Sequence, residues 1–146
     1  MSLIISEIYL LYMTKLIDDM LLNEVTVQAK ASPRLRMNYN FHKDLSDKCQ
    51  RLLNALELGT VMPVHHHKVD EIWVVLRGRL RLTIHNDLGE VIESYELSPS
   101  LGRYGANIPA GAWHSLECLE SGTVLLECKE GPYIPHEVGG VKYNCK

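Results

Sequence analysis

Two histidine-containing segments constrain the fold of this chain more than any other feature. They have the patterns Gly59-x5-His65-x-His67-x3-Glu71-x6-Gly78 and Pro109-x-Gly111-x2-His114. Side chains alternate along a strand, so His65 and His67 would point the same way from it, roughly 6.6 Å apart. On a helix the same two residues would be about 200° apart around the axis. The pattern therefore favours extended chain, with both imidazoles directed at one point.

The two segments supply four potential ligands for one divalent metal ion: His65, His67, Glu71 and His114. Three neutral imidazoles and one carboxylate form a borderline donor set that suits Zn, Fe, Mn, Ni or Co. An octahedral ion would keep two positions open for water or a chelating substrate, which is what Lewis-acid or oxygen chemistry needs. We predict an open metal site and leave the identity of the metal undetermined.

The size and charge of the chain limit the classes of protein to consider. With 146 residues it fits a single domain, and a net charge of −3 provides no broad basic surface. Nucleic acid and membranes are therefore not expected as partners, whereas small molecules are. The four cysteines form no CxxC pair, which is typical of a protein in a reducing compartment.

Hydrophobic periodicity predicts an all-β fold with one leading helix. Apolar residues recur at helical spacing over residues 15–31, and Pro33 ends that segment. Short runs of strand-forming residues separated by turn residues follow. The nine expected strands are 34–41, 50–58, 61–67, 71–77, 79–85, 91–97, 103–108, 113–119 and 123–129. Strands at this spacing indicate a sandwich or a barrel.

The chain divides into four expected parts. Residues 1–12, apolar but interrupted by Glu7, are interpreted as an extension added by cloning or by an early start site, the alternative being a strand at a dimer edge. Residues 13–33 hold the helix, 34–130 the β domain, and the Pro- and Gly-containing residues 131–146 an irregular tail. Open sheet edges and apolar residues near the N-terminus favour a homodimer.

One polar strand face could bind a ligand. Arg34, Arg36, Asn38 and Asn40 share a face of the predicted strand 34–41. The simpler interpretation is a strand with one side in solvent. The alternative places Asn40, together with Arg51, among polar groups that line a ligand pocket.

Other candidate pocket residues are single side chains. Trp73 shares strand parity with Glu71, so it would wall the cavity, either as core or as a platform for substrate. Glu127 and Lys129 alternate with Cys128, and the pattern leaves open whether their charges face water or the cavity. The candidates for a general base are His42, Tyr104 and Glu127.

Three further predictions concern residues near these patterns. His66 lies between two ligands on the opposite pleat and is expected in solvent, and Cys118 is expected to line the interior without reaching the metal. Arg77, Arg79 and Arg81 resemble a phosphate-binding stripe, but the alternation of Leu80 and Leu82 turns Arg79 and Arg81 outward. A solvated face is the preferred interpretation.

The two histidine segments resemble the two signatures of the cupin superfamily. The first matches at every defining position and the second matches its PxGxxH core, although Cys118 stands where that signature often has Asn. The resemblance implies a small double-stranded β-helix, or jelly roll, with the metal held in one mouth by His65, His67, Glu71 and His114.

Flanking motifs are similar to the WbuC family of cupin-fold metalloproteins. They are Asn38-Tyr39-Asn40-Phe41-His42, Ser46-Asp47-Lys48-Cys49-Gln50-Arg51-Leu52 and the stretch 126–133. This resemblance implies a cytoplasmic protein of bacterial O-antigen or polysaccharide gene clusters that acts on a sugar or sugar nucleotide. We therefore expect a metal-dependent isomerase or epimerase, in which the ion stabilises an enediolate-like charge. An Fe(II)-dependent dioxygenase and a non-catalytic, metal-dependent saccharide-binding module stay open as alternatives.

Overall fold

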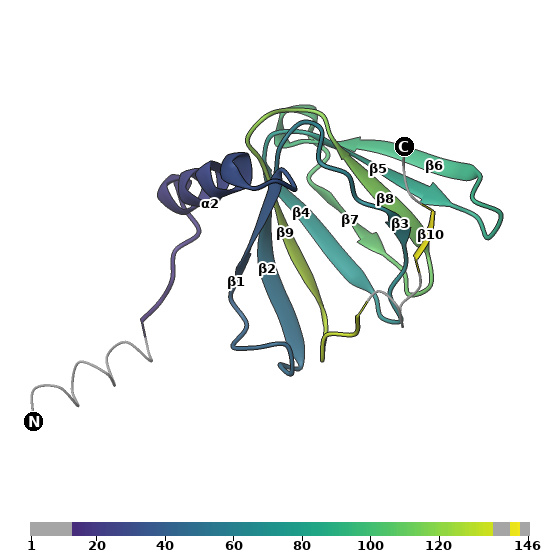
Figure 1. The fold of residues 1–146 in the computed structure, drawn as a ribbon, viewed down its shortest axis with the longest axis horizontal. Coiled ribbons are helices and arrows are strands. Elements are labelled where there is room, and N and C mark those ends of the chain that lie inside the picture. The colour runs from purple at the N-terminus through teal and green to yellow at the C-terminus, as the bar shows by residue number, and fades with distance from the viewer. Residues whose placement is uncertain (1–12, 136–140, 144–146) are drawn as a thin grey trace, which may run out of the picture.

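The computed structural model describes residues 13–135 and 141–143 and consists of two facing antiparallel sheets with one helix packed outside (Figure 1). The first sheet has the strand order β1-β2-β9-β4-β7, and the second has β10-β3-β8-β5-β6. The elements are α2 (Asp19–Ala31), β1 (Arg36–Asn40), β2 (Cys49–Leu56), β3 (Val64–His65), β4 (Glu71–Arg77), β5 (Leu80–His85), β6 (Val91–Leu97), a 3-10 turn (Pro99–Leu101), β7 (Gly105–Ile108), β8 (Trp113–Cys118), β9 (Thr123–Glu130) and β10 (Val141–Tyr143). The predicted all-β class with a leading helix is confirmed.

Helix α2 covers the outer face of the first sheet. Asp18 caps it by accepting a hydrogen bond from the N–H of Leu21 at 3.0 Å. Its buried side packs against outward-facing residues of β2 and β9, in a cluster made of Leu21, Leu22, Val25, Ala29, Leu53, Ala55 and Val124. The helix begins four residues later than predicted, because Asp18 caps it, and two apolar residues of the predicted segment 15–31, Leu16 and Met20, are exposed.

Arg77 of β4 links helix α2 to the first sheet through hydrogen bonds. Its guanidinium donates to the carbonyl of Leu22 at 3.0 Å, to Thr26 Oγ1 at 2.9 Å and to Asn23 Oδ1 at 2.7 Å. The interpretation of Arg77 as part of a solvated stripe is therefore wrong, because α2 covers the face on which it lies.

Arg79 and Arg81 behave as the alternation predicts. Arg79 Nε donates to Glu96 Oε2 at 2.9 Å, and Arg81 Nη1 donates to Glu117 Oε2 at 2.5 Å. Both arginines thus have acidic partners on the outside of the second sheet, which leaves no phosphate-binding stripe there.

The main apolar core lies between the two sheets. It consists of Leu56, Trp73, Val75, Leu80, Leu82, Leu97, Ile108, Leu116, Cys118 and Leu125. Cys118 belongs to this core, as its predicted inward direction requires, and its thiol donates to the carbonyl of Leu56 at 3.5 Å. It is not among the lining residues of the polar cavity. The core fills one end of the space between the sheets and leaves the other end for polar groups.

The C-terminal segment differs from its predicted irregular course. Val141–Tyr143 forms β10, which pairs antiparallel with β3, with Val141 opposite His65. The Pro and Gly residues around it hide a three-residue strand from pattern analysis. The prediction for residues 1–12 lies outside the described residues. Within the described ranges, the helix is too short and too polar to cross a membrane.

Candidate metal centre

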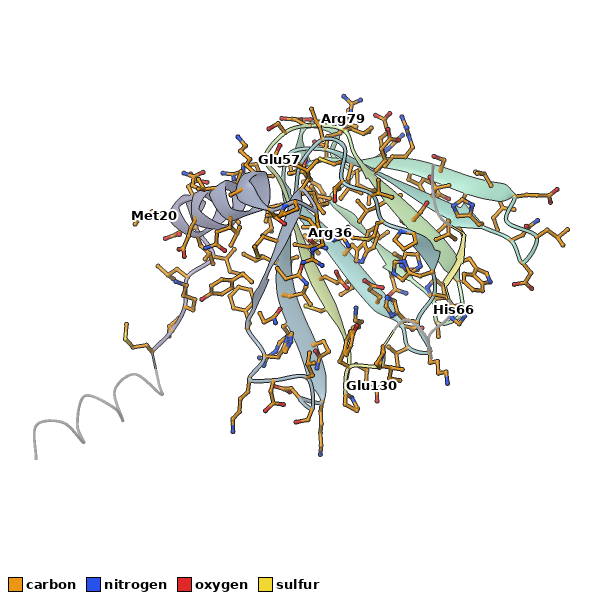
Figure 2. The ribbon with its side chains drawn as sticks, in the orientation of Figure 1. Met20, Arg36, Glu57, His66, Arg79 and Glu130 are labelled. Carbon is orange, nitrogen blue, oxygen red and sulfur yellow. The ribbon has the colours of Figure 1, made fainter. Side chains whose placement is uncertain are left out.

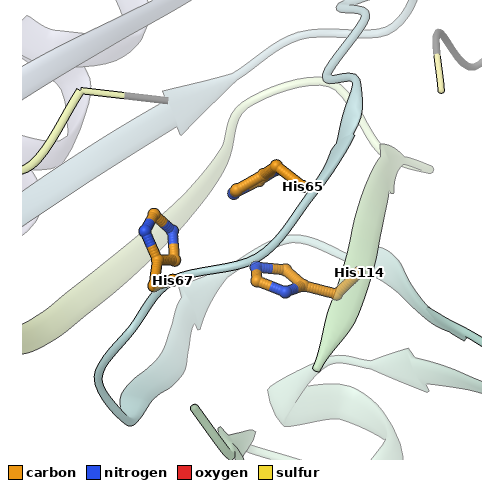
Figure 3. A group of neighbouring side chains, drawn as sticks. All are labelled: His65, His67 and His114. Atoms are coloured by element: carbon orange, nitrogen blue, oxygen red, sulfur yellow. The ribbon is translucent and has the colours of Figure 1, made fainter. Parts of the chain in front are cut away.

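Three histidines converge where the two sequence segments meet. His65 ends β3 and lies directly opposite His114 of β8, and His67 follows two residues after His65. Their ring nitrogens that could serve as ligands all lie within 4.8 Å of one another, and Figure 3 shows the rings gathered around one point. The ring centroids of His65 and His114 are 4.4 Å apart, and those of His65 and His67 are 4.9 Å apart.

Glu71 approaches this group from the other sheet. It begins β4, and its Oε2 lies 3.2 Å from Nε2 of His67 and 3.6 Å from Nε2 of His114. Trp73 Nε1 donates to the other carboxylate oxygen at 2.5 Å and so fixes the orientation of the carboxylate. Glu71 is 2% exposed and His114 is 1% exposed, so the centre is closed on its inner side.

Backbone carbonyls set the tautomers of two of the histidines. Nδ1 of His65 lies 2.9 Å from the carbonyl of Pro63, and Nδ1 of His114 lies 2.8 Å from the carbonyl of Ala112. A carbonyl only accepts, so each Nδ1 carries the hydrogen and the lone pair of each neutral ring is on Nε2. This is the tautomer that a metal-binding imidazole needs.

Two acceptors then face each other without a donor between them. His114 Nε2 and Glu71 Oε2 are both buried and neither has a hydrogen-bond partner. A lone pair 3.6 Å from a carboxylate oxygen is unfavourable unless a cation lies between them or a proton is added. The three imidazoles, with ligand atoms within 4.8 Å of one another, fit a divalent transition metal ion, and the Glu71 carboxylate lies beside them.

A cavity of about 350 Å³ opens beside the histidine group. This volume is in the range of small-molecule sites. Its lining residues come from β1, β2, β4, β9 and the segments next to β3, and include Arg34, Arg36, Asn38, Asn40, His42, Gln50, Leu52, Asn54, His65, His67, Glu71, Trp73, Glu127 and Lys129. The described part of the chain therefore joins the candidate metal centre to a polar pocket.

The polar face of β1 lies toward this cavity. Met37, Tyr39 and Phe41 on its other face pack against the α2 cluster, which turns Arg36 and Asn38 inward. Asn38 and Asn40 are solvent-exposed and also line the cavity. The two interpretations of this face are therefore compatible: it is solvent-exposed along much of its length, and it also lines the cavity, because α2 covers the opposite face.

Arg51 does not accompany Asn40 into the cavity. Asn40 pairs with Leu52 across the strands, so Gln50, Leu52 and Asn54 share its side while Arg51 points to the opposite face. There its Nη2 lies 3.5 Å from Asp47 Oδ2. The pocket residues Gln50 and Asn54 were missed, although their parity with Leu52 could have indicated them once the register was known.

The other single-residue predictions divide between the cavity and the surface. Trp73 is buried, belongs to the core and also lines the cavity beside Glu71. His42 lines the cavity, and its Nδ1 accepts from the N–H of Arg51 at 2.9 Å. Tyr104 precedes β7, is 62% exposed and is not among the residues that line the cavity.

Glu127 and Lys129 form a buried ion pair next to the candidate ligands. Lys129 Nζ lies 2.6 Å from Glu127 Oε1 and 4.0 Å from Glu71 Oε1. Burial and the charge of Glu71 raise the pKa of Glu127 to about 8. Burial opposes ionisation of Glu71, but contacts with His114 and Glu127 and the charge of Lys129 hold the pKa of Glu71 well below its usual value. The side chains left open by the strand pattern thus face the cavity.

His66 was expected in solvent, but the structure has it half-buried. Its ring lies edge-on to Trp113 with 4.3 Å between ring centroids. It points away from the histidine group, as the alternation of side chains requires.

Comparison with known proteins places the chain in a family. Residues 17–97, more than half of the chain, match the family described as "Domain of unknown function (DUF6016)". The chain belongs to the DUF6016 family. No curated protein sequence matches this DUF6016 chain.

Solved structures show that the DUF6016 chain has the cupin fold. A cupin superfamily protein from Desulfitobacterium hafniense has 16% identity and a TM-score of 0.53, over 65% of this chain and 76% of that one. A conserved protein of unknown function from Streptococcus pyogenes has 16% identity and a TM-score of 0.57, over 84% and 91%. Oxalate decarboxylase of Bacillus subtilis, described with Mn(II) centres, has 19% identity and a TM-score of 0.52, over 70% of this chain and 26% of that one.

Asn54 of this DUF6016 chain is expected to destabilise the folded state, because its buried amide oxygen has no hydrogen-bond partner. It is 4% exposed and its Oδ1 has no hydrogen-bond partner. Replacing Asn54 by Leu removes this unsatisfied acceptor, so we expect the free energy of unfolding to rise by about 1 kcal/mol and Tm by about 3 °C. Thermal unfolding of Asn54→Leu beside Leu52→Ile, a change of shape alone, measures it. A lower Tm for Asn54→Leu would contradict this account of the cavity wall.

Proposed function

We propose that this protein is a metal-dependent enzyme that isomerises or epimerises a sugar or a sugar-nucleotide-like substrate. One observation supports it above all: donor atoms of His65, His67, Glu71 and His114 gather at the closed end of a cavity whose walls carry amides and charged groups. Sugars bind through many hydrogen bonds, and such walls supply both donors and acceptors.

Each residue near the centre has a distinct role in this proposal. A bound divalent ion would supply Lewis acidity toward a hydroxyl or carbonyl oxygen. Glu127 lines the cavity beside Glu71 and moves the proton, and Lys129 holds the Glu127 carboxyl in place at 2.6 Å. The core that surrounds Trp73 excludes water from the inner side.

The biological setting is part of the same proposal. The motifs around Asn40, Gln50 and Glu127 resemble those of the WbuC family, which supports a cytoplasmic role in polysaccharide metabolism. These three residues all line the cavity. Part of each motif of the WbuC resemblance therefore lines the pocket. Dimer formation through the open sheet edges stays a prediction.

Deuterium exchange tests the proposed reaction. Protein purified without added metal or chelator is analysed for metals and incubated in D2O with a panel of sugars and nucleotide sugars. We expect near-stoichiometric metal and deuterium incorporation at a carbon of one substrate, seen by NMR. Glu127→Gln should lower the exchange rate by about 10²–10⁴-fold with its metal content unchanged. The matched control is Glu130→Gln, at the exposed end of β9 (Figure 2).

The same incubation separates the alternatives. Oxygen consumption without deuterium exchange would show a dioxygenase, and a thermal shift with no change in the sugar would show a binding module. Protein without metal, or Glu127→Gln with the exchange rate of Glu130→Gln, would overturn the proposed mechanism.

A further inference from the structure

Two arginines line the cavity without an acidic partner among the described residues. Arg34 and Arg36 both line it, and in the part of the chain that the structure describes neither forms an ion pair with a carboxylate. Three arginines outside the cavity differ, since Arg51, Arg79 and Arg81 each pair with Asp or Glu. Arg77, also outside it, is held by uncharged acceptors of α2. The two cavity arginines therefore carry positive charge that the described residues leave unbalanced.

The surroundings of Arg36 hold its guanidinium toward the cavity. Its Nη1 donates to the carbonyl of Val61 at 2.6 Å, which anchors one edge of the fork. It projects from β1 into the space between the sheets (Figure 2). Burial, and to a smaller extent the neighbouring charge of Arg34, lower the pKa of Arg36, so its charge lacks compensation in this position. An anion bound between them would supply that compensation.

The wall between the arginines and the metal centre is lined with amides. Asn38 pairs with Asn54 across β1 and β2, and both line the cavity. Asn54 Oδ1 is a buried acceptor without a partner, which suits a hydroxyl group of a ligand. Along the first sheet, from Arg36 toward Glu71, the cavity wall thus offers guanidinium groups, amides and then the candidate ligands.

We propose that Arg34 and Arg36 form a subsite for an oxyanion, a carboxylate or a phosphate, carried by a sugar whose hydroxyl groups reach Asn54 and the metal centre. Guanidinium groups bind such oxyanions through paired hydrogen bonds. The sugar part of this inference rests on the proposed function, whereas the oxyanion subsite rests on the two arginines. The substrate class is therefore an acidic sugar or a sugar phosphate.

Titration calorimetry with three matched probes tests the subsite: D-glucose, D-glucuronate and D-glucose 6-phosphate. We expect at least one charged probe to bind about tenfold or more tightly than glucose, and the preferred probe tells carboxylate from phosphate. Arg34→Gln and Arg36→Gln should each remove about tenfold of that preference and reduce its dependence on salt. Arg51→Gln, one strand away on the opposite face, should leave it unchanged.

Two controls keep the result interpretable. Arg36→Lys retains the charge but not the fork, so its affinity for the charged probe should lie between those of wild type and Arg36→Gln. Equal affinities for glucose and both charged probes, including no binding of any, would overturn the subsite, as would an unchanged preference in both Gln variants. Metal content measured on the same samples separates the proposals: metal-free protein with an intact anion preference contradicts only the proposed function.

Discussion

Replacing His65 and His67 together by Ala is expected to abolish metal binding and to lower the Tm of protein purified with its metal. The double variant removes two of the three imidazoles whose ligand atoms lie within 4.8 Å. A ligand at a thousand times its Kd stabilises the folded state by about 4 kcal/mol, so losing it should lower Tm by about 10 °C. Elemental analysis and calorimetry measure the two effects on one sample.

His66→Ala is the matched control for this variant. It also removes an imidazole, from the residue between the two, but this ring packs on Trp113 and points away from the centre. We expect full metal content and only a small loss of stability from the lost ring contact. The ligand assignment is contradicted if the double variant keeps wild-type metal content. It is equally contradicted if His66→Ala loses as much metal as the double variant.

The candidate ligands could be predicted from the sequence because local geometry determines most of their arrangement. His65 and His67 are two residues apart, so extended chain alone directs both to one side. His114 joins them because β8 pairs with β3, and the turn around Gly111 sets where β8 begins. Donor chemistry marks Glu71 as a candidate in the sequence, but its approach from the first sheet depends on how the two sheets face each other.

The walls of the cavity could not be predicted, because the direction of a strand face depends on what covers the other side. The alternation over residues 34–41 separates a polar face from an apolar face. Helix α2 buries the apolar face with Met37, Tyr39 and Phe41, and this decides that Arg36 faces inward. Nothing in the strand itself carries that information.

The register between paired strands is the second feature that could not be predicted. Asn40 and Arg51 were predicted to act together, but Asn40 pairs with Leu52, and a shift of one residue reverses every side chain. The same dependence on register left Glu127 and Lys129 undecided. Their pairing with Trp73 and Glu71 on β4 places both in the cavity. The direction of these side chains depends on which strand each strand pairs with, and the spacing of turns in the sequence does not determine that pairing.

Replacing Gly105 by Ala is expected to destabilise the protein by about 3 kcal/mol or more, because β7 lies too close to β4 for a side chain there. An added Cβ would overlap the carbonyl oxygen of Trp73 and come within 2.9 Å of its carbonyl carbon. Gly105 pairs with Val74, and the next backbone bond joins the N–H of Val75 to the carbonyl of Tyr104 at 2.7 Å. We expect Tm to fall by about 10 °C in thermal unfolding.

The damage should extend to the metal centre, because β4 also carries Glu71 and Trp73. Moving β7 outward strains the strand that aims the Glu71 carboxylate at His67 and His114, so metal affinity should fall together with Tm. Gly102→Ala is the control: this glycine has a φ of 66° and an added Cβ would meet nothing within 4 Å, so only the conformational cost of about 1 kcal/mol remains. If the two variants unfold at the same temperature, close approach of β7 is not what requires glycine at position 105. If Gly105→Ala unfolds earlier but binds metal normally, the position of Glu71 does not depend on this pairing.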